Sequence, residues 1–334
     1  MDDVFTGMAR TKQRGSNDMK QVTQRKVMNA ITFITVALLI GGCALSTSLS
    51  RLSITPTFLL THTPEASSTA TPTATPTETA TPTVTPTETA TATATPCTAT
   101  AGTVEKVSIP SGALGVPLPA SIYLPPCYDP TGNYPVLYLL HGQGMDDTYW
   151  ISLGVTGIAD RAIDQGQTPF IMVFPFEERN LDDNSTSKFP DAIIDDLIPW
   201  VDSNYATCDQ KVCRAVGGIS RGGGWAIKLA LRYIDLFGTL GGHSYGLMFG
   251  DANWVQKQLE NHTIDDFPRI YLDRGEQDSL APDIDYFVKV LLANGIRPIF
   301  HIYPGGHTRS YWRTHVQEYM DFYMDSWPEP FPQP

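Results

Sequence analysis

The segment Gly218-Ile219-Ser220-Arg221-Gly222 determines how the rest of this 334-residue chain is interpreted. It follows the apolar run Arg214–Gly217, which predicts a strand, and it precedes Gly223–Tyr233, whose pattern predicts a helix. A glycine-flanked serine between a strand and a helix is typical of a nucleophile elbow, a sharp strained turn that exposes the hydroxyl. Side chains at the flanking positions would collide with the neighbouring strand and helix. Because a G-x-S-x-G string also arises by chance in a glycine-rich chain, Ser220 needs partners elsewhere.

The partners that Ser220 needs are a histidine and a carboxylate at other strand ends, since a serine hydroxyl is inert near neutral pH without a base. His307 is the expected base, because it follows two glycines directly after the last predicted strand. The expected acid is Asp278, a few residues beyond the predicted strand Arg269–Leu272, and Glu276 is the alternative. The chain order serine, acid, histidine is that of α/β-hydrolases and differs from the chymotrypsin and subtilisin orders.

Other polar residues near strand ends have supporting roles in this interpretation. His141 and His243 each follow a predicted strand, so both are expected to line the site without acting as the base. Asp273 lies close to the strand register and is expected to be buried or paired with Arg274.

Acyl transfer places negative charge on a carbonyl oxygen, and backbone N–H donors aimed at it are each worth roughly 3 kcal/mol. One donor is expected at Arg221, directly after the nucleophile. The other is expected at Gln143, in the glycine-containing loop His141–Gly144.

The first 103 residues differ in composition from the rest and are expected to lie outside the folded domain. Residues 1–42 combine a basic start, an apolar run at 30–40 and small residues before Cys43, which is typical of a lipoprotein-type signal peptide. Lipid attachment to Cys43 would anchor the protein to the outer face of a bacterial cell membrane. Plain secretion and an uncleaved anchor are the alternatives, although the apolar run is short for a spanning helix. Residues 43–103 repeat Thr-Pro and Thr-Ala units, which predicts a disordered spacer, with a mucin-like stalk as the alternative.

Residues 104–334 have the size of one α/β domain. The formal net charge of −12 argues against binding nucleic acid or anionic lipid through general electrostatics. Membrane association is therefore expected only through the N-terminal lipid anchor.

Four cysteines beyond Cys43 suggest disulfide bonds in an exported protein. Three pairings are possible, and the short spacing of Cys208 and Cys213 favours a bond between them, which leaves Cys97 for Cys127. No metal or other cofactor is expected, because this spacing lacks a second pair of zinc ligands.

Short apolar runs alternate with helical patterns over residues 104–334, which predicts an α/β fold with a mostly parallel eight-stranded sheet and helices on both faces. The expected strands are Val104–Ile109, Ala120–Leu124, Pro135–Leu140, Phe170–Phe174, Arg214–Gly218, Thr239–Gly242, Arg269–Leu272 and Pro298–Tyr303. The expected helices are Asp191–Tyr205, Gly223–Tyr233, Trp254–Asn261, Asp283–Asn294 and Ser310–Ser326. No connection is long enough for a large lid domain, so an open site is expected at the carboxyl ends of the strands.

Five segments resemble one family in the same order: Tyr134–Gly142, Asp196–Trp200, Gly218–Gly223, Gly275–Asp278, and Gly306–His307 with Trp312. They resemble the esterase family of α/β-hydrolases that includes esterase D, feruloyl esterases, enterochelin esterases and mycolyltransferases. The resemblance covers essentially all of residues 104–327. It implies an α/β-hydrolase fold, a triad of Ser220, Asp278 and His307, and an oxyanion hole from Gln143 and Arg221. Arg221 stands where the family most often has methionine, so its cationic side chain is expected to affect which acyl groups fit.

The resulting hypothesis is an extracytoplasmic serine carboxylic ester hydrolase that acts through an acyl-enzyme, with feruloyl or acetyl esters of carbohydrates as candidate substrates. Four residues near predicted loops are candidates for substrate binding, with core packing as the alternative for each aromatic one: His141, Trp150, Tyr245 and Trp312. An acyltransferase would use the same triad and pass the acyl group to a sugar hydroxyl. A serine peptidase and a non-catalytic envelope or carbohydrate-binding module are the remaining alternatives.

Overall fold

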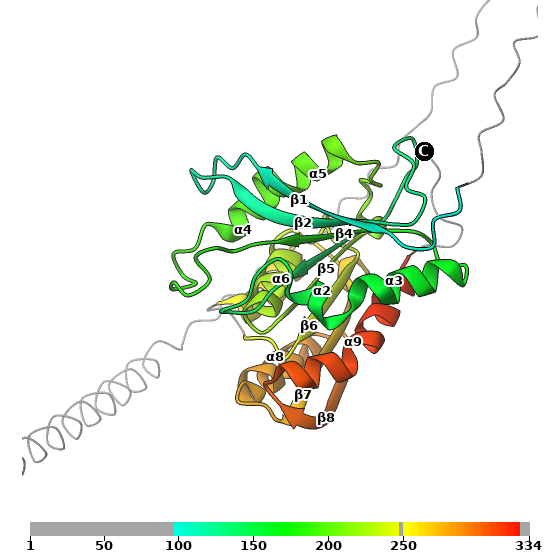
Figure 1. Ribbon diagram of the computed structural model, residues 1–334. Helices are drawn as coiled ribbons and strands as arrows, with labels where there is room; N and C mark the ends of the chain where they lie inside the picture. The colour runs from blue at the N-terminus through cyan, green and yellow to red at the C-terminus, as the bar shows by residue number, and fades with distance from the viewer. Residues whose placement is uncertain (1–96, 247–249, 328–334) are drawn as a thin grey trace, which may run out of the picture. The chain divides into compact units, whose positions relative to one another are not determined.

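Eight strands form one twisted sheet in the order β1-β2-β4-β3-β5-β6-β7-β8 (Figure 1). The structure is a computed structural model that describes residues 97–246 and 250–327. The predicted signal peptide, the predicted lipidation residue Cys43 and most of the predicted spacer lie outside the described residues. The strands are β1 (Thr103–Ile109), β2 (Leu118–Leu124), β3 (Val136–Leu140), β4 (Ile171–Pro175), β5 (Arg214–Ile219), β6 (Thr239–His243), β7 (Arg269–Gln277) and β8 (Ile299–Gly306).

The six strands from β3 to β8 run parallel, and β1 and β2 form an antiparallel margin. Both β3 and β4 are fully buried along their length, as their continuous apolar runs require of strands covered on two faces. The predicted α/β fold with a mostly parallel eight-stranded sheet is therefore confirmed.

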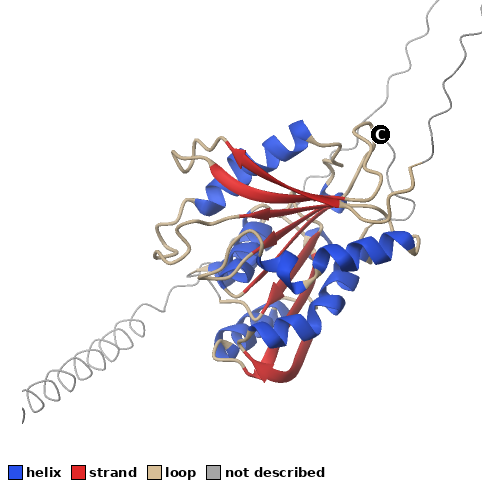
Figure 2. Cartoon of the chain, viewed as in Figure 1, coloured by secondary structure: helices blue, strands red, loops and turns tan. Residues whose placement is uncertain are grey.

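Helices cover both faces of the sheet (Figure 2). Alternate residues of β3 point to opposite faces, so Val136 and Tyr138 belong to one apolar core and Leu137 and Leu139 to the other. The first core is covered by α4 (Phe189–Ala192), α5 (Ile198–Asn204), α6 (Arg221–Arg232), α7 (Asp251–Leu259) and α8 (Ala281–Ala293). The second is covered by α2 (Tyr149–Leu153), α3 (Val155–Asp164) and α9 (Arg309–Met324).

The largest differences between the structure and the predicted elements lie in three places. Helices α2 and α3 were not predicted; they are separated by Gly154, whose left-handed φ of 104° ends the first helix. The predicted helix 191–205 is divided by a π-helical turn, η1 (Ile193–Leu197). Strand β7 runs five residues further than predicted, because β8 pairs with it as far as Gln277.

Two disulfide bonds join Cys97 to Cys127 and Cys208 to Cys213. This is the pairing that the spacing of the cysteines favours.

Within residues 97–246 and 250–327 no helix is both long and apolar enough to cross a membrane. In the same residues no connection between strands forms a large lid domain.

Candidate active site

Ser220 lies in a strained turn between β5 and α6, with a φ of 56° and a ψ of −120°. Few residues other than glycine adopt a positive φ, and such backbone strain clusters at functional sites. The flanking glycines allow the turn to pack. A Cβ on Gly218 would lie 2.2 Å from the carbonyl carbon of Gly222, and a Cβ on Gly222 would lie 2.2 Å from the carbonyl oxygen of Leu140. The segment therefore has the geometry of a nucleophile elbow.

His307 and Asp278 lie beside Ser220 at the same edge of the sheet. Strands β5, β7 and β8 end at this edge, and each of the three residues follows one of them. The His307 Nε2 atom is 2.8 Å from Ser220 Oγ, and its Nδ1 atom is 3.2 and 3.3 Å from the two Asp278 carboxylate oxygens. A hydroxyl that donates to Nε2 and an Nδ1–H that donates to a carboxylate form the arrangement that activates a serine.

The Asp278 carboxylate is held in an ionised state suited to this contact. Its side chain is fully buried. Burial alone would raise the pKa of Asp278, but hydrogen bonds from His307 and from the Leu280 backbone N–H outweigh burial and lower that pKa below its ordinary value. The alternative acid, Glu276, is exposed on β7 and has no contact with His307 among those of the described residues.

The loop after β3 lies directly against the nucleophile. A Cβ on Gly142 would be 3.2 Å from the Ser220 Cβ, so Gln143, the next residue, lies close to the elbow and is exposed. His141 is buried; its Nδ1–H donates to the Gly142 carbonyl (2.8 Å) and its Nε2 accepts from the Glu177 N–H (3.0 Å). Burial lowers the pKa of His141, which keeps the imidazole neutral and able to accept. His141 therefore fixes the loop from inside and does not face the open site.

The aromatic candidates for substrate binding are buried. Trp150 is 1% exposed and donates to the Leu140 carbonyl, and Tyr245 is fully buried and donates to the Ile284 carbonyl. Both belong to the apolar cores, which is the core-packing alternative given for each aromatic candidate. Trp312 is also buried, but it packs edge-on against the His307 ring at 5.1 Å, where it restrains the imidazole.

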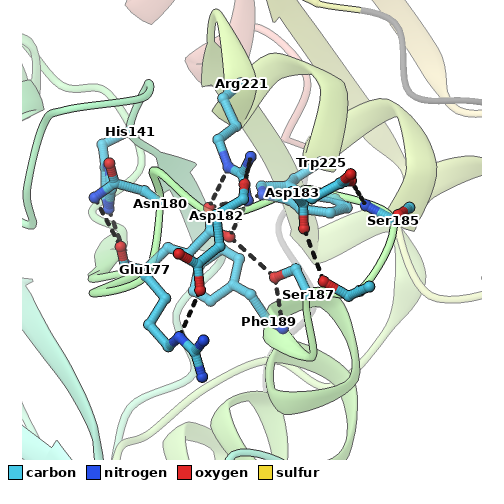
Figure 3. A network of polar contacts seen from close by, with 12 residues as sticks. His141, Glu177, Asn180, Asp182, Asp183, Ser185, Ser187, Phe189, Arg221 and Trp225 are labelled. Carbon is cyan, nitrogen blue, oxygen red and sulfur yellow. Dashed lines mark hydrogen bonds and ion pairs between the residues drawn. The ribbon is translucent and has the colours of Figure 1, made fainter.

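The Arg221 side chain pairs with Glu177, at the start of the loop after β4 (Figure 3). Both side chains are less than a tenth exposed. The expectation that this cation directly affects acyl fit is therefore not supported by its position. Sequence reasoning missed Glu177 altogether, although an acidic residue directly after a buried strand was an available signal.

His243 and Asp273 form a separate buried pair beneath the site. His243 is fully buried on β6, between β5 and β7. It was expected to line the site, and its burial shows that it does not. Its Nδ1 is 2.9 Å from Asp273, whose carboxylate also accepts from the hydroxyls of Tyr311 and Tyr319. Asp273 is buried as expected, but Arg274 pairs with Asp285 instead.

A cavity of about 280 Å³ opens at the same edge of the sheet, beside the loop after β4. Its walls include Val116, Pro119, Phe176 and Glu178. The Phe176 N–H donates to the Pro119 carbonyl where β4 ends and β2 begins, which places the cavity two strands away from β5. Neighbouring strands are about 4.8 Å apart, so the cavity lies roughly 10–15 Å from Ser220.

A mostly parallel sheet with a serine, an aspartate and a histidine at the carboxyl ends of three strands is the architecture of the α/β-hydrolases. Residues 111–321 match the family described as "Putative esterase", and the chain belongs to that family.

Curated relatives share parts of this domain. An endo-1,4-beta-xylanase/feruloyl esterase of Xylanibacter ruminicola is 34% identical over 153 residues, which cover 42% of this chain and 21% of the relative. An esterase of Mycobacterium tuberculosis is 32% identical over 142 residues, which cover 40% of this chain and 30% of the relative. The chain therefore spans less than a third of the length of these relatives.

Solved structures share the fold. A ferulic acid esterase superposes with a TM-score of 0.60 at 20% identity, over 68% of this chain and 99% of that chain. The feruloyl esterase module from Clostridium thermocellum superposes with a TM-score of 0.58 at 20% identity, over 67% of this chain and 88% of that chain.

Proposed function

We propose that this protein is a serine carboxylic ester hydrolase that acts through an acyl-enzyme on Ser220. The observation that carries the proposal is the 2.8 Å contact between His307 Nε2 and Ser220 Oγ, with Asp278 behind the imidazole. Membership of an esterase family supports the same reaction class.

In the proposed reaction, Ser220 Oγ attacks the ester carbonyl carbon while its proton passes to His307 Nε2. The resulting oxyanion accepts hydrogen bonds from the backbone N–H groups of Gln143 and Arg221. His307 then gives the proton to the departing alcohol, which leaves the acyl group on Ser220. A water molecule attacks the acyl carbonyl carbon and gives its proton to His307, which returns that proton to Oγ as the acid is released.

The test of the reaction class is hydrolysis of short p-nitrophenyl esters by the purified protein. Ser220→Ala should reduce kcat by about 10⁴-fold or more, because the nucleophile is lost. Fluorophosphonate labelling should modify the unaltered protein and leave the variant unmodified. Undiminished hydrolysis by Ser220→Ala would contradict the proposal.

For the substrate, we infer carbohydrate-linked esters, with feruloyl and acetyl esters as the first candidates. Support comes from the Xylanibacter ruminicola relative, which is named an endo-1,4-beta-xylanase/feruloyl esterase. The cavity beside Phe176 offers space for a substrate portion that extends beyond the reacting ester. A panel of acetyl, butyryl and feruloyl esters, each tested with and without a glycoside acceptor, would rank the acyl groups and would reveal transfer to sugars.

For the location, we infer export followed by lipid attachment at Cys43, with a spacer over residues 43–103 and the esterase domain over residues 104–334. The lipoprotein-type start of the sequence and the two disulfide bonds support export. Expression in a bacterium with labelled palmitate tests this inference: the full-length protein should incorporate label, and Cys43→Ser should not. Equal labelling of the two would exclude attachment at Cys43.

A further inference from the structure

Glu177 has no role in the proposed chemistry, yet its buried carboxylate accepts four hydrogen bonds (Figure 3). Oε1 accepts from Arg221 Nη2 (2.7 Å) and from the Ser187 hydroxyl (3.0 Å). Oε2 accepts from Arg221 Nε (2.9 Å) and from Trp225 Nε1 (2.9 Å). A carboxylate offers about four acceptor positions, so all the acceptor positions of Glu177 are used. Three of the four bonds come from Arg221 and Trp225, near the start of α6.

The backbone of Glu177 is hydrogen-bonded to residues that hold the loop after β3, the loop that carries Gln143. Its N–H donates to His141 Nε2 (3.0 Å), and its carbonyl accepts from the side-chain amide of Asn180 (2.8 Å). Asn180 in turn accepts from the Gly144 N–H (2.6 Å) and donates to the Met145 carbonyl (3.2 Å). The residues on both sides of Gln143 are therefore held by the segment that begins at Glu177.

We propose that Glu177 is a positioning residue that sets the relative placement of the two oxyanion donors, the backbone N–H groups of Gln143 and Arg221. Glu177 contacts residue 221 through its carboxylate, and it contacts the loop that carries residue 143 through its main chain and Asn180. These donors act only when both lie about 2.7–3.1 Å from the developing oxyanion. The role rests on the proposed function, because the oxyanion forms only in acyl transfer.

The negative charge of Glu177 is needed because the Arg221 guanidinium is buried as well. A buried guanidinium without a counter-charge is unfavourable, and an amide in place of the carboxylate turns an NH₂ group towards N–H donors. In Glu177→Gln the Arg221 side chain must therefore move or draw in water, and the first turn of α6 moves with it.

The experiment compares Glu177→Gln with Asp202→Asn. The control removes the same kind of charge from another arginine pair at the opposite end of β5, in which Asp202 is 2.9 Å from the buried Arg214 and is itself 25% exposed. Glu177→Gln should lower kcat for p-nitrophenyl acetate by about 100-fold, the cost of a small misplacement in a catalytic site. The KM should change by less than about threefold, because the donors act mainly in the transition state. Asp202→Asn should lower Tm to a similar extent but leave kcat within about twofold of the unaltered protein.

A second readout measures the oxyanion site directly. An aryl trifluoromethyl ketone forms a tetrahedral adduct with serine and places an oxyanion between the two donors. Its affinity should fall in Glu177→Gln by about the same factor as kcat. An amide analogue of the ketone forms no tetrahedral adduct, so its binding affinity should be the same in Glu177→Gln and in the unaltered protein.

A double variant, Glu177→Leu with Arg221→Met, keeps the proposal testable if Glu177→Gln does not fold. It removes both charges, so no buried ion is left unpaired. Its kcat should remain at least about tenfold below that of the unaltered protein even where its Tm recovers. Recovery of full kcat in the double variant, or a kcat loss in Asp202→Asn equal to that in Glu177→Gln, would overturn the positioning role.

The two proposals fail differently. If the unaltered protein neither hydrolyses esters nor reacts with a fluorophosphonate, the proposed function is wrong and the role of Glu177 falls with it. If the unaltered protein is active and Glu177→Gln has the same kcat and ketone affinity, only the role of Glu177 is wrong.

Discussion

At the scale of single residues, Ser220 stores backbone strain that its surroundings sustain. Its positive-φ conformation costs roughly 1–3 kcal/mol for a residue with a side chain. The Ser220 N–H donates to the His243 carbonyl, and the Ser220 carbonyl accepts from the N–H groups of Gly224 and Gly246. These bonds to α6, to β6 and to the residues after β6 hold the turn in place beside His307.

Asp278→Asn should lower kcat by about 10⁴-fold, because an amide can no longer hold the imidazole in the tautomer that accepts from Ser220. Steady-state hydrolysis of p-nitrophenyl acetate measures the effect. Glu276→Gln is the matched control, since Glu276 is exposed on the same strand, and its kcat should stay within about twofold. Equal losses in the two variants would contradict the assignment of Asp278.

The lowered pKa of Asp278 also predicts a pH-dependent stability. A carboxyl whose folded pKa lies below its unfolded value stabilises the fold above the unfolded pKa, and this stabilisation is lost as the pH falls through the folded pKa. The Tm difference between the unaltered protein and Asp278→Asn should therefore be larger at about pH 6 than at about pH 2.5, on either side of an ordinary aspartate pKa of about 3.9. Thermal unfolding at both pH values measures it, with the exposed Asp209→Asn as control. A difference that does not change with pH would count against this linkage.

At the scale of elements, a buried polar network joins β6 and β7 to α9. Asp273 on β7 accepts from His243 on β6 and from Tyr311 and Tyr319 on α9, and His243 Nε2 lies 2.9 Å from the Tyr323 hydroxyl. Burial raises the pKa values of Tyr311 and Tyr319, so both phenols remain protonated donors. The network lies in the interior, where a lost partner is costly.

Asp273→Asn should lower the free energy of unfolding by about 3 kcal/mol, because an NH₂ group would face buried donors. Urea unfolding measures this loss. Asp285→Asn removes the partly exposed pair with Arg274 and should cost about 1 kcal/mol or less. Similar losses in the two variants would mean that the network contributes no more than a surface ion pair.

The loop that follows β4 lines the cavity, and Val116 lies in its wall away from the catalytic triad, so filling the cavity at Val116 should alter binding without altering the chemistry. Val116 is 55% exposed at the cavity wall, and Val116→Trp should fit there without loss of core packing. The KM for a feruloylated oligosaccharide should rise by about five- to tenfold, while that for p-nitrophenyl acetate should stay within about twofold. Steady-state kinetics with both substrates tests this, and an unchanged ratio would exclude the cavity as a substrate subsite.

At the scale of the whole molecule, both apolar cores and every residue of the candidate site lie within residues 97–327. The disulfide bond between Cys97 and Cys127 ties the first described residue to the segment after β2. We therefore expect a protein shortened to residues 97–334 to retain Tm and to keep kcat/KM within about twofold of the full-length value. Circular dichroism and esterase assays measure both, and a tenfold loss would show that the preceding residues contribute to the site.

Several features could be predicted from the sequence because they depend on local sterics and on connectivity. The Gly-x-Ser-x-Gly spacing requires close backbone packing at Gly218 and Gly222, and the order of Ser220, Asp278 and His307 follows the order of β5, β7 and β8 along the sheet. Continuous apolar runs identified β3 and β4. Helices α2 and α3 were missed, since a left-handed glycine divides them into two short segments.

The sequence by itself determined the fold class and placed a serine, a carboxylate and a histidine at strand ends, because strand periodicity, glycine sterics and parallel connectivity are local properties. Only the tertiary structure decided that Trp150 and Tyr245 belong to the core and that Glu177 pairs with Arg221, 44 residues away. Such contacts depend on the strand order, which inserts β3 between β4 and β5, and on which face of the sheet each side chain joins. Side chains far apart in the chain meet through packing, and packing has no local pattern in the sequence.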